Sequence, residues 1–533
     1  MVDVLVIGSG GAGLSAALSA KKSGAYVLVV NKSYPTRAQT SMAQGGINGV
    51  LYEEDDTIKH HFDDTIKSAH GLSKPEIVEK MVQQAPKIIK WLDSIGTPFS
   101  RTNDKKIAQR RLGAVSYARA CYSQDYTGLK ILHTLYDQCL KEGIEFLNEH
   151  YLLNFVTEDN NIKGATFLDI RTSQIKAIEA KSVIVATGGY ASVYHNFTTN
   201  THGSSGDGIA AAVRAGARVS NIEFVQFHPT ALNGSNILIS ESARGAGGYL
   251  LNHKFERFTD ELAPRDKLAR EIYEEIEKNK VVYLDIRHLG KDFIEESLPQ
   301  ERKLAKLYSG LDPVDDIIPI HPVAHYSMGG IEVDENSQSR VKGLFACGEC
   351  ANIGVHGANR LGGNSLLEIL VFGEDAGKNA TLFAKNIKSD FSIQNHPQFL
   401  NDTRFIDACF RFPNQIDFYE KREFLGKIFY RNAGIIREEM NLKGVLSVLR
   451  QIQKEYTFMG IADKTSTYNT NLVEFIEFGN MVEIAEIILV GAISRHESRG
   501  AHYRLDKPKE DDINFKENTI MWKEEGILCT NFD

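Results

Sequence analysis

The chain has 533 residues, of which 42% are hydrophobic and 24% charged, an ordinary composition for a soluble globular protein of roughly three to four structural units. Its net charge of −8 disfavours a nucleic-acid partner, because phosphate binding needs clustered Lys and Arg. We expect a cytoplasmic protein, since no apolar run reaches the roughly 18 residues of a spanning helix and the first predicted strand, at Val2, leaves no room for a secretion signal.

The first thirty residues predict a βαβ unit. The apolar run at 2–7 is typical of a buried parallel strand, and a glycine-rich turn follows at 8–13. Small residues up to Gly24 predict a helix that packs closely on a sheet, and 25–30 predicts a second strand.

The turn carries the GxGxxG pattern of a dinucleotide site. Gly8 permits the tight turn, Gly10 lets the backbone approach a pyrophosphate, and Gly13 lets the helix pack on the strand. The helix N-terminus then presents unpaired N–H groups to the phosphates. The acidic residue that NAD enzymes carry after the second strand is replaced by Asn31 and Lys32, which lowers the case for NAD.

Two later strands favour FAD instead. A strand at 181–190 ends in the glycines of ATGG, and a strand at 341–349 ends at Glu349, where a carboxylate can accept a hydrogen bond from a ribose hydroxyl. Cys347 and Cys350 form a CxxC in this strand, but no nearby ligand pair supports a metal. We favour a plain strand-to-loop turn there, with a metal or redox pair as the weaker alternative.

The other segments change character along the chain. Residues between about 223 and 321 are rich in charge, with predicted helices at Asp266–Lys280 and Lys291–Lys306. Helices are again predicted over Glu420–Lys454 and Asn471–Ser494, the latter as an amphipathic helix because four glutamates interrupt its apolar residues.

These elements predict an α/β protein with a Rossmann-like FAD-binding domain, an inserted α+β capping domain and a C-terminal helical domain. We expect the polar tail after these domains to be irregular. The expected boundaries are 1–222 and 322–385 for the two parts of the FAD-binding domain, 223–321 for the capping domain, 386–498 for the helical domain and 499–533 for the tail.

Eight ordered stretches resemble the flavoprotein subunits of succinate dehydrogenase and fumarate reductase, and their relative L-aspartate oxidase. The resemblance covers nearly the whole chain. The stretches are PTRAQTSMAQGG (35–46), HTLYDQ (133–138), QFHPT (226–230), ISESARGAGGYLLN (239–252), APRDKLAR (263–270), HYSMGG (325–330), HGANRLGGNSLLE (356–368) and ESRGAHYR (497–504).

The resemblance implies a dicarboxylate held over the flavin ring, between the FAD-binding and capping domains. The matching positions for the two carboxylates are His228, Ser240, His325 and Arg360. Such charge-assisted donors suit a dianion, and an arginine can hold a carboxylate with two hydrogen bonds.

Three further residues match the catalytic groups of the family. Arg265 corresponds to the residue that carries a proton to or from the substrate carbon, while Glu241 and Arg244 correspond to the relay that supplies it. The flavin N5 exchanges a hydride with the other carbon. The predicted FAD contacts are Gly8, Gly10, Gly11, Gly13, Lys32, Gln39, Thr40, Gln44, Gly45, Gly46, Asp207, Glu349, Ser365 and Leu366.

Two positions depart from the family pattern. Gln39 stands where the dehydrogenases have the histidine that links the flavin covalently, so we expect non-covalent FAD. Leu112 stands at a substrate position where the dehydrogenases usually have Phe and aspartate oxidases have Glu.

The leading hypothesis is therefore a succinate dehydrogenase or fumarate reductase flavoprotein. It would exchange electrons with an iron–sulfur subunit, since the chain has no iron–sulfur cysteine pattern of its own, and would lie at the cytoplasmic face of a membrane through partner subunits. L-aspartate oxidase is one alternative, because QFHPTAL, ELAPRD and YLDIRH lean toward it. A non-catalytic FAD electron-transfer subunit is another.

Overall fold

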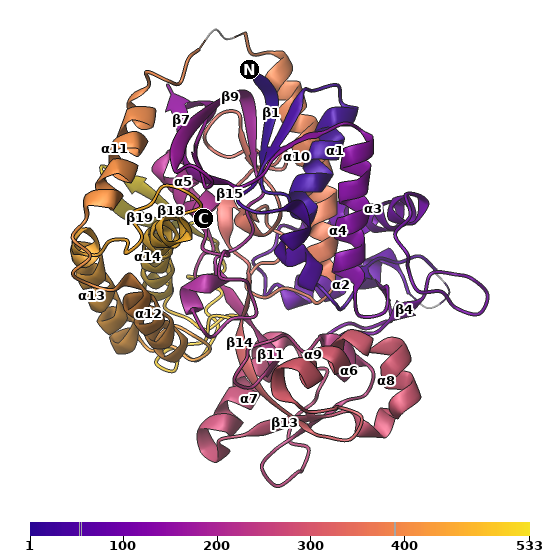
Figure 1. The fold of residues 1–533 in the computed structure, drawn as a ribbon. Coiled ribbons are helices and arrows are strands. Elements are labelled where there is room, and N and C mark those ends of the chain that lie inside the picture. Colours follow the sequence, from indigo (N-terminus) through magenta and orange to yellow (C-terminus); the bar gives the residue numbers. More distant parts are fainter. Residues whose placement is uncertain (53, 55, 389–390) are drawn as a thin grey trace.

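A seven-stranded sheet lies at the centre of the protein in the computed structural model, which describes residues 1–52, 54, 56–388 and 391–533 (Figure 1). β1 lies between β2 and β9 in parallel, with β6 beyond β2 and β16 alongside β9, while β8 and β7 continue the sheet in antiparallel. The strands are β1 (Val2–Ile7), β2 (Val27–Val30), β6 (Glu145–Leu147), β7 (His150–Glu158), β8 (Asn161–Asp169), β9 (Gln174–Val185) and β16 (Leu344–Ala346).

The predicted βαβ opening is confirmed. Helix α1 (Gly11–Lys22) packs closely along α10 (Asn364–Lys385), which begins more than 300 residues later. The turn before α1 needs glycine, because Gly8 has φ +105° and a Cβ there would lie 2.1 Å from the Ala186 carbonyl oxygen. The two later strands are placed correctly but bounded differently: β9 runs from 174 to 185 rather than 181 to 190, and β16 is limited to three residues.

Of the four other helices in this part of the chain, one packs on β7, and the other three pack on α1, on α10 and on one another. A small three-stranded sheet in the order β3-β5-β4 lies beside them. These elements are α2 (Ile58–Ser68), α3 (Pro75–Ser94), α4 (Thr127–Lys141), α5 (Asp207–Arg214), β3 (Ile47–Asn48), β4 (Gln109–Arg110) and β5 (Ala120–Cys121).

A separate lobe, the cap, is built on a four-stranded antiparallel sheet in the order β11-β14-β13-β12 (Figure 1). Its buried apolar residues form their own cluster between Leu232 and Ile320. The predicted helix at 291–306 is two helices, because Pro299 disfavours helical geometry at Leu298. The elements are β11 (Val225–Leu232), β12 (Tyr249–Leu251), β13 (Val282–Asp285), β14 (Ile318–Ser327), α6 (Glu241–Gly245), α7 (Arg265–Asn279), α8 (Lys291–Ser297) and α9 (Pro299–Ser309).

Four helices form the C-terminal lobe, the first in orange and the others in brown and gold in Figure 1. The helical stretch predicted over 420–454 is divided into α12 and α13. The prediction of an amphipathic helix at 471–494 is wrong, since α14 is buried around most of its circumference and even the Glu477 side chain is only 9% exposed. The helices are α11 (Pro397–Arg411), α12 (Phe418–Asn432), α13 (Glu439–Glu455) and α14 (Thr470–Ser494).

The prediction of an irregular tail at 499–533 is confirmed for residues 499–518, which form no helix or strand, but is wrong for the end of the tail. A hairpin of β18 (Thr519–Glu524) and β19 (Ile527–Phe532) extends a second sheet through β10 (Val219–Ser220), β15 (Gly330–Glu332) and β17 (Ala351–Asn352). No helix in the part of the chain that the structure describes is both long and apolar enough to cross a membrane.

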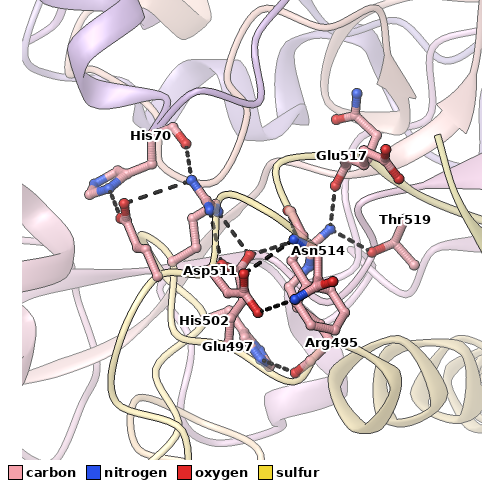
Figure 2. A network of polar contacts seen from close by, with 12 residues as sticks. His70, Arg495, Glu497, His502, Asp511, Asn514, Glu517 and Thr519 are labelled. Carbon is pink, nitrogen blue, oxygen red and sulfur yellow. Dashed lines mark hydrogen bonds and ion pairs between the residues drawn. The ribbon is translucent and has the colours of Figure 1, made fainter.

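Buried ion pairs fix the segment that leads to this hairpin (Figure 2). Glu497 accepts hydrogen bonds from Arg495 and Arg499, both at 2.8–2.9 Å. Arg499 also donates to the His70 carbonyl oxygen at 2.8 Å, and Arg495 donates to Thr519 Oγ1 at 2.8 Å. These hydrogen bonds therefore hold the segment both to the turn after α2 and to the hairpin.

Candidate functional site

A cavity of about 850 Å³ runs from the glycine-rich turn to the gap between the central sheet and the cap. This volume is in the upper part of the range for small-molecule and cofactor sites, as expected for a ligand as long as a dinucleotide. All the predicted site residues line it except Gly13 and Arg244. Gly13 instead packs under the turn, where a Cβ would lie 2.0 Å from the Gly8 carbonyl oxygen.

The residues at the glycine-rich end fit FAD. Gln44 is buried, lines the cavity, and has no hydrogen-bond partner for either side-chain polar atom within the described residues. Buried polar groups are nearly always paired, so these atoms are arranged for a polar ligand. Gly10 and Gly11 open the N-terminus of α1 toward the same space, and Thr40 Oγ1 accepts a hydrogen bond from Gly11 N at 3.0 Å.

Lys32 also lines the cavity, where two acidic residues hold its side chain. Its ammonium donates to the Gly203 carbonyl at 2.6 Å and to the carboxylates of Asp207 and Glu477 at 2.7 Å each. Although burial alone would lower the pKa of Lys32, the two carboxylates raise it above its usual value. Lys32 is therefore a half-buried cation that pairs with both Asp207 and Glu477 and ties α14 to the nucleotide-binding sheet.

Glu349 follows β16, as predicted. Its carboxylate accepts a hydrogen bond from Ser327 N at 3.0 Å, and burial raises the pKa of Glu349 to about 7. A carboxyl with this pKa is well suited to a ribose hydroxyl, since it can accept or donate. Cys347 and Cys350 lie in the predicted strand-to-turn segment as buried free thiols, and no His, Cys, Asp or Glu cluster suited to a metal was found among the described residues.

Two histidines face each other at the cap end of the cavity. The rings of His228 and His325 are 5.0 Å apart, and Thr199 Oγ1 lies 2.7 Å from His325 Nδ1. Burial lowers the pKa of both imidazoles well below its usual value, and the nearby charge of Arg265 lowers both further. Both rings are therefore neutral at pH 7 in the absence of an anion, and each can donate one hydrogen bond to a carboxylate.

Arg360 lies beside them under tight restraint. Its guanidinium stacks on the Tyr326 ring at 4.0 Å from the centroid and donates to Ser365 Oγ at 2.6 Å and to Gln226 Oε1 at 3.1 Å. Burial, and then repulsion from Arg265, lowers the pKa of Arg360 to about 10, so it remains charged at neutral pH. The arrangement places a fixed cation where a carboxylate can be bound with two hydrogen bonds.

The three predicted catalytic residues form one buried group. Arg265 donates to Glu241 Oε2 through Nε at 3.2 Å and through Nη2 at 2.5 Å, and Arg244 Nη2 lies 3.9 Å from the other Glu241 oxygen. Burial would raise the pKa of Glu241, but the charges of Arg265 and Arg244 hold it below its usual value. Arg265 and Glu241 both line the cavity, whereas Arg244 lies behind them.

Leu112 lines the cavity from the loop that joins β4 to β5. Its side chain is 1% exposed, lies against Gly45, and leads into Gly113, whose N–H donates to Glu241 Oε1 at 2.9 Å. Neighbouring Arg111 is exposed, and Ser116 Oγ is bound to Asp64 at 2.6 Å. The loop thus presents an apolar side chain, and neither polar neighbour, to the cavity.

Ser240 is the N-cap of α6, and a buried carboxyl pair holds its backbone. Ser240 Oγ accepts from Ser242 N at 3.1 Å, while Ser240 N donates to Glu301 Oε1 at 2.9 Å. Glu301 N donates to Asp125 across the contact between cap and central lobe. Burial raises the pKa of Asp125 to about 6, and burial with repulsion from Asp125 raises the pKa of Glu301 well above its usual value.

We predict that Glu301→Gln stabilises the protein at high pH only. Because both folded-state pKa values exceed those of the unfolded chain, the free energy of unfolding falls as pH rises from about 4 through 6 and beyond. The amide keeps the acceptor for Ser240 N but cannot ionise. Urea unfolding followed at about pH 5 and about pH 8 should give a higher midpoint for the variant at pH 8 alone. The exposed Glu296→Gln is the matched control, and a pH-independent difference would contradict the prediction.

Several cavity residues were not predicted from the sequence. Tyr326 stacks on Arg360, Leu238 contributes an apolar wall from the cap, and Glu477 comes from the C-terminal lobe. Gln226 contacts both Arg265 and Arg360 although it lies just outside the lining. Gln226 and Tyr326 stand inside the matched stretches QFHPT and HYSMGG, which was the available signal.

The fold and the cavity define a dinucleotide-binding oxidoreductase of the Rossmann type with a substrate cap. A family model described as "FAD binding domain" matches residues 3–366, and one described as "Fumarate reductase flavoprotein C-term" matches residues 422–529. The chain belongs to the family of fumarate reductase and succinate dehydrogenase flavoprotein subunits.

Named relatives match over almost the full length. The chain is 40% identical to the 8-methylmenaquinol:fumarate reductase flavoprotein subunit of Wolinella succinogenes, over 97% of this chain and 88% of that protein. It is 35% identical to the fumarate reductase flavoprotein subunit of Escherichia coli, over 98% and 92%. A solved structure of an E. coli quinol fumarate reductase variant superposes with a TM-score of 0.94 at 34% identity, covering 100% of this chain and 96% of that one.

Proposed function

We propose that this chain is the catalytic flavoprotein subunit of a fumarate reductase or succinate dehydrogenase, with fumarate reduction the favoured direction. The observation that carries the proposal is the convergence of His228, His325, Arg360 and Arg265 on one buried end of a cavity whose other end fits FAD. Full-length similarity to fumarate reductase subunits supports it.

Charge complementarity accounts for the choice of substrate. Arg360 binds one carboxylate, while the neutral imidazoles and the Ser240 hydroxyl donate to the other. Leu112 and Leu238 close the apolar sides, which suits a ligand whose two carboxylates are joined only by carbon. Burial excludes water and strengthens each of these contacts.

Arg265 delivers the proton in the proposed reaction. Bound FAD supplies hydride exchange at N5. As negative charge develops on the substrate carbon opposite the hydride, the adjacent guanidinium stabilises it and gives up a proton. Arg265 would then regain a proton from outside: a new proton would reach the Glu241 carboxylate by way of Arg244, the next group inward, and pass from Glu241 to Arg265.

The electrons are proposed to arrive through an iron–sulfur subunit that receives them from a quinol. Relatives are named as subunits, and the Wolinella protein is named for its quinol substrate. Quinols reside in membranes, so this chain would be held at the cytoplasmic face through its partners. Isolation from native membranes should recover it with an iron-containing chain, whereas a fully active free monomer would argue against the partner.

We further propose that FAD is bound without a covalent bond. Gln39 lines the cavity and its Oε1 accepts from Thr201 N at 3.2 Å. A carboxamide cannot form the ring-nitrogen link to flavin that histidine forms. Acid precipitation should therefore release all the yellow colour into the supernatant, and colour left in the pellet would show that another residue anchors the flavin. In this family the covalent link accompanies a higher flavin potential, so its absence favours fumarate reduction.

Turnover by the purified, FAD-loaded protein tests the function. Reduced viologen should be oxidised on addition of fumarate, at a rate that saturates with fumarate concentration. Malonate, an unreactive dianion of similar charge spacing, should compete. Failure of the FAD-loaded protein to reduce fumarate or oxidise succinate would sink the proposal.

A further inference from the structure

One buried amide connects the two arginines of the site. Gln226, on β11, is fully buried, and its Oε1 accepts from Arg265 Nη1 at 3.1 Å and from Arg360 Nη2 at 3.1 Å. The two guanidinium groups repel each other, so a shared acceptor between them fixes their relative position.

The orientation of this amide is determined by its other end. Gln226 Nε2 donates to the Arg360 carbonyl oxygen at 2.8 Å and to Asn359 Oδ1 at 2.8 Å. A carbonyl can only accept and a guanidinium can only donate, so just one amide orientation satisfies all the partners.

Asn359 passes the same constraint to the cap. Because its Oδ1 faces Gln226, its Nδ2 must face the other way, where it donates to Asp266 Oδ1 at 3.1 Å and more weakly to Ser68 Oγ at 3.4 Å. Asp266 is 7% exposed, and its second oxygen accepts from Arg270 at 3.0 Å, with His70 Nε2 at 4.0 Å. Both Asp266 oxygens thus act as acceptors, which matches the Asn359 donor.

These contacts form a closed ring. Arg265 and Asp266 are adjacent at the start of α7 in the cap, and Asn359 and Arg360 are adjacent in the loop before α10. Gln226 joins Arg265 to Arg360, and the Asp266–Asn359 hydrogen bond joins the same two segments a second time. Because the two segments are joined at two points, both the distance between the start of α7 and the loop before α10 and their relative tilt are restrained.

We propose that Gln226, Asn359 and Asp266 are positioning residues that hold the proton donor Arg265 in register with the carboxylate-binding Arg360. The inference rests on the proposed function of those two arginines. Neither Asn359 nor Asp266 lines the cavity, so both act through the groups they hold. Small misplacements of reacting groups can lower rates about 100-fold, and that is the effect expected here.

The test is a donor–acceptor exchange between positions 266 and 359, made in the FAD-loaded protein. Asn359→Asp keeps the acceptor for Gln226 but sets a carboxylate against Asp266. We expect kcat for fumarate to fall about 100-fold while malonate affinity, read from the flavin spectrum, changes less than about 5-fold. Lower pH should partly restore kcat, because the introduced carboxyl regains a donor when protonated.

In the double variant Asp266→Asn, Asn359→Asp, position 266 carries the donor and position 359 the acceptor, and the net charge is that of the wild type. Its kcat should be at least about 10-fold higher than that of Asn359→Asp alone. Arg270→Gln is the control, since it removes the other partner of Asp266 and a contact with Gly500 but leaves the ring intact. Its kcat should stay within about 3-fold of the wild type.

Wild-type kcat in Asn359→Asp, or no recovery in the exchanged double variant, would overturn the inference. If Asn359→Asp does not retain flavin, Asn359→Ser provides the same comparison without a second carboxylate, and unchanged kcat in that variant would equally overturn it. A wild-type protein inactive with fumarate would instead sink the proposed function, so the two failures are distinguishable.

Discussion

Arg265→Ala should retain FAD and lose turnover with fumarate by several orders of magnitude. The side chain is 9% exposed, lies at the cavity, and donates two hydrogen bonds to Glu241. In the proposed mechanism its loss removes the proton donor together with the charge that stabilises the developing carbanion, and one such electrostatic contact alone is commonly worth about 10²–10³ in rate. Arg265 lies outside the glycine-rich turn that is proposed to hold the FAD pyrophosphate, so flavin binding should persist.

Assays with reduced viologen measure the turnover with fumarate, and the flavin absorption spectrum measures separately how much FAD the variant retains. Lys267→Ala is the matched control, because Lys267 lies on the same helix two positions away and is 58% exposed. It should leave kcat within about 2-fold of the wild type, as is usual for exposed sites. Near-normal turnover in Arg265→Ala would remove Arg265 from the proposed mechanism.

L-aspartate should be a negligible substrate compared with fumarate or succinate. Its ammonium group needs a buried acceptor, and an unpaired buried charge is costly. Leu112 offers no acceptor at the position where aspartate oxidases carry Glu. Sites that leave a polar group unpaired discriminate by a factor of about 10⁴. Rates with the three compounds under one set of conditions test this, and L-aspartate oxidation as fast as fumarate reduction would favour the aspartate oxidase alternative.

Variants of Leu112 extend the same test. Leu112→Glu would bring a second carboxylate near Glu241, whose Oε1 is bound by the neighbouring Gly113 N. Fumarate turnover should fall, because a buried carboxylate repels a dianion. Leu112→Met preserves volume and apolar character and should stay close to the wild type.

Local patterns predicted the parts of the fold that depend on neighbours in sequence. The βαβ opening and the role of Gly8 follow from short-range rules, and both are confirmed. The C-terminal hairpin was missed because its turn, Glu525-Gly526, is not the Asn-Gly or Asp-Gly pair usual in such turns, and the apolar residues of β18 do not alternate with polar ones. Helix α14 was misjudged since its glutamates find buried partners that are distant in sequence: Glu477 pairs with Lys32 from 445 positions away.

The residues of the candidate site also divide into those that the sequence predicted and those that it did not. Charged residues inside matched motifs were predicted, since their chemistry suggests a role without any geometry. Gln226 and Asn359 are neutral amides, and their importance lies in which way each amide faces. That orientation depends on partners from three separate segments, which no local pattern encodes.

The late pairing of β10 has a consequence for biosynthesis. Strand β18 lies against it, and Thr519 N donates to Asn221 Oδ1 across 298 positions. At roughly 5–20 residues per second, a ribosome needs on the order of 15–60 s to synthesise that interval. During this time one edge of β10 stays unpaired on the nascent chain, exposed to misassembly with other strands. The protein therefore completes its second sheet only after translation has passed residue 519, and fragments that end earlier should be poorly soluble and depend on chaperones.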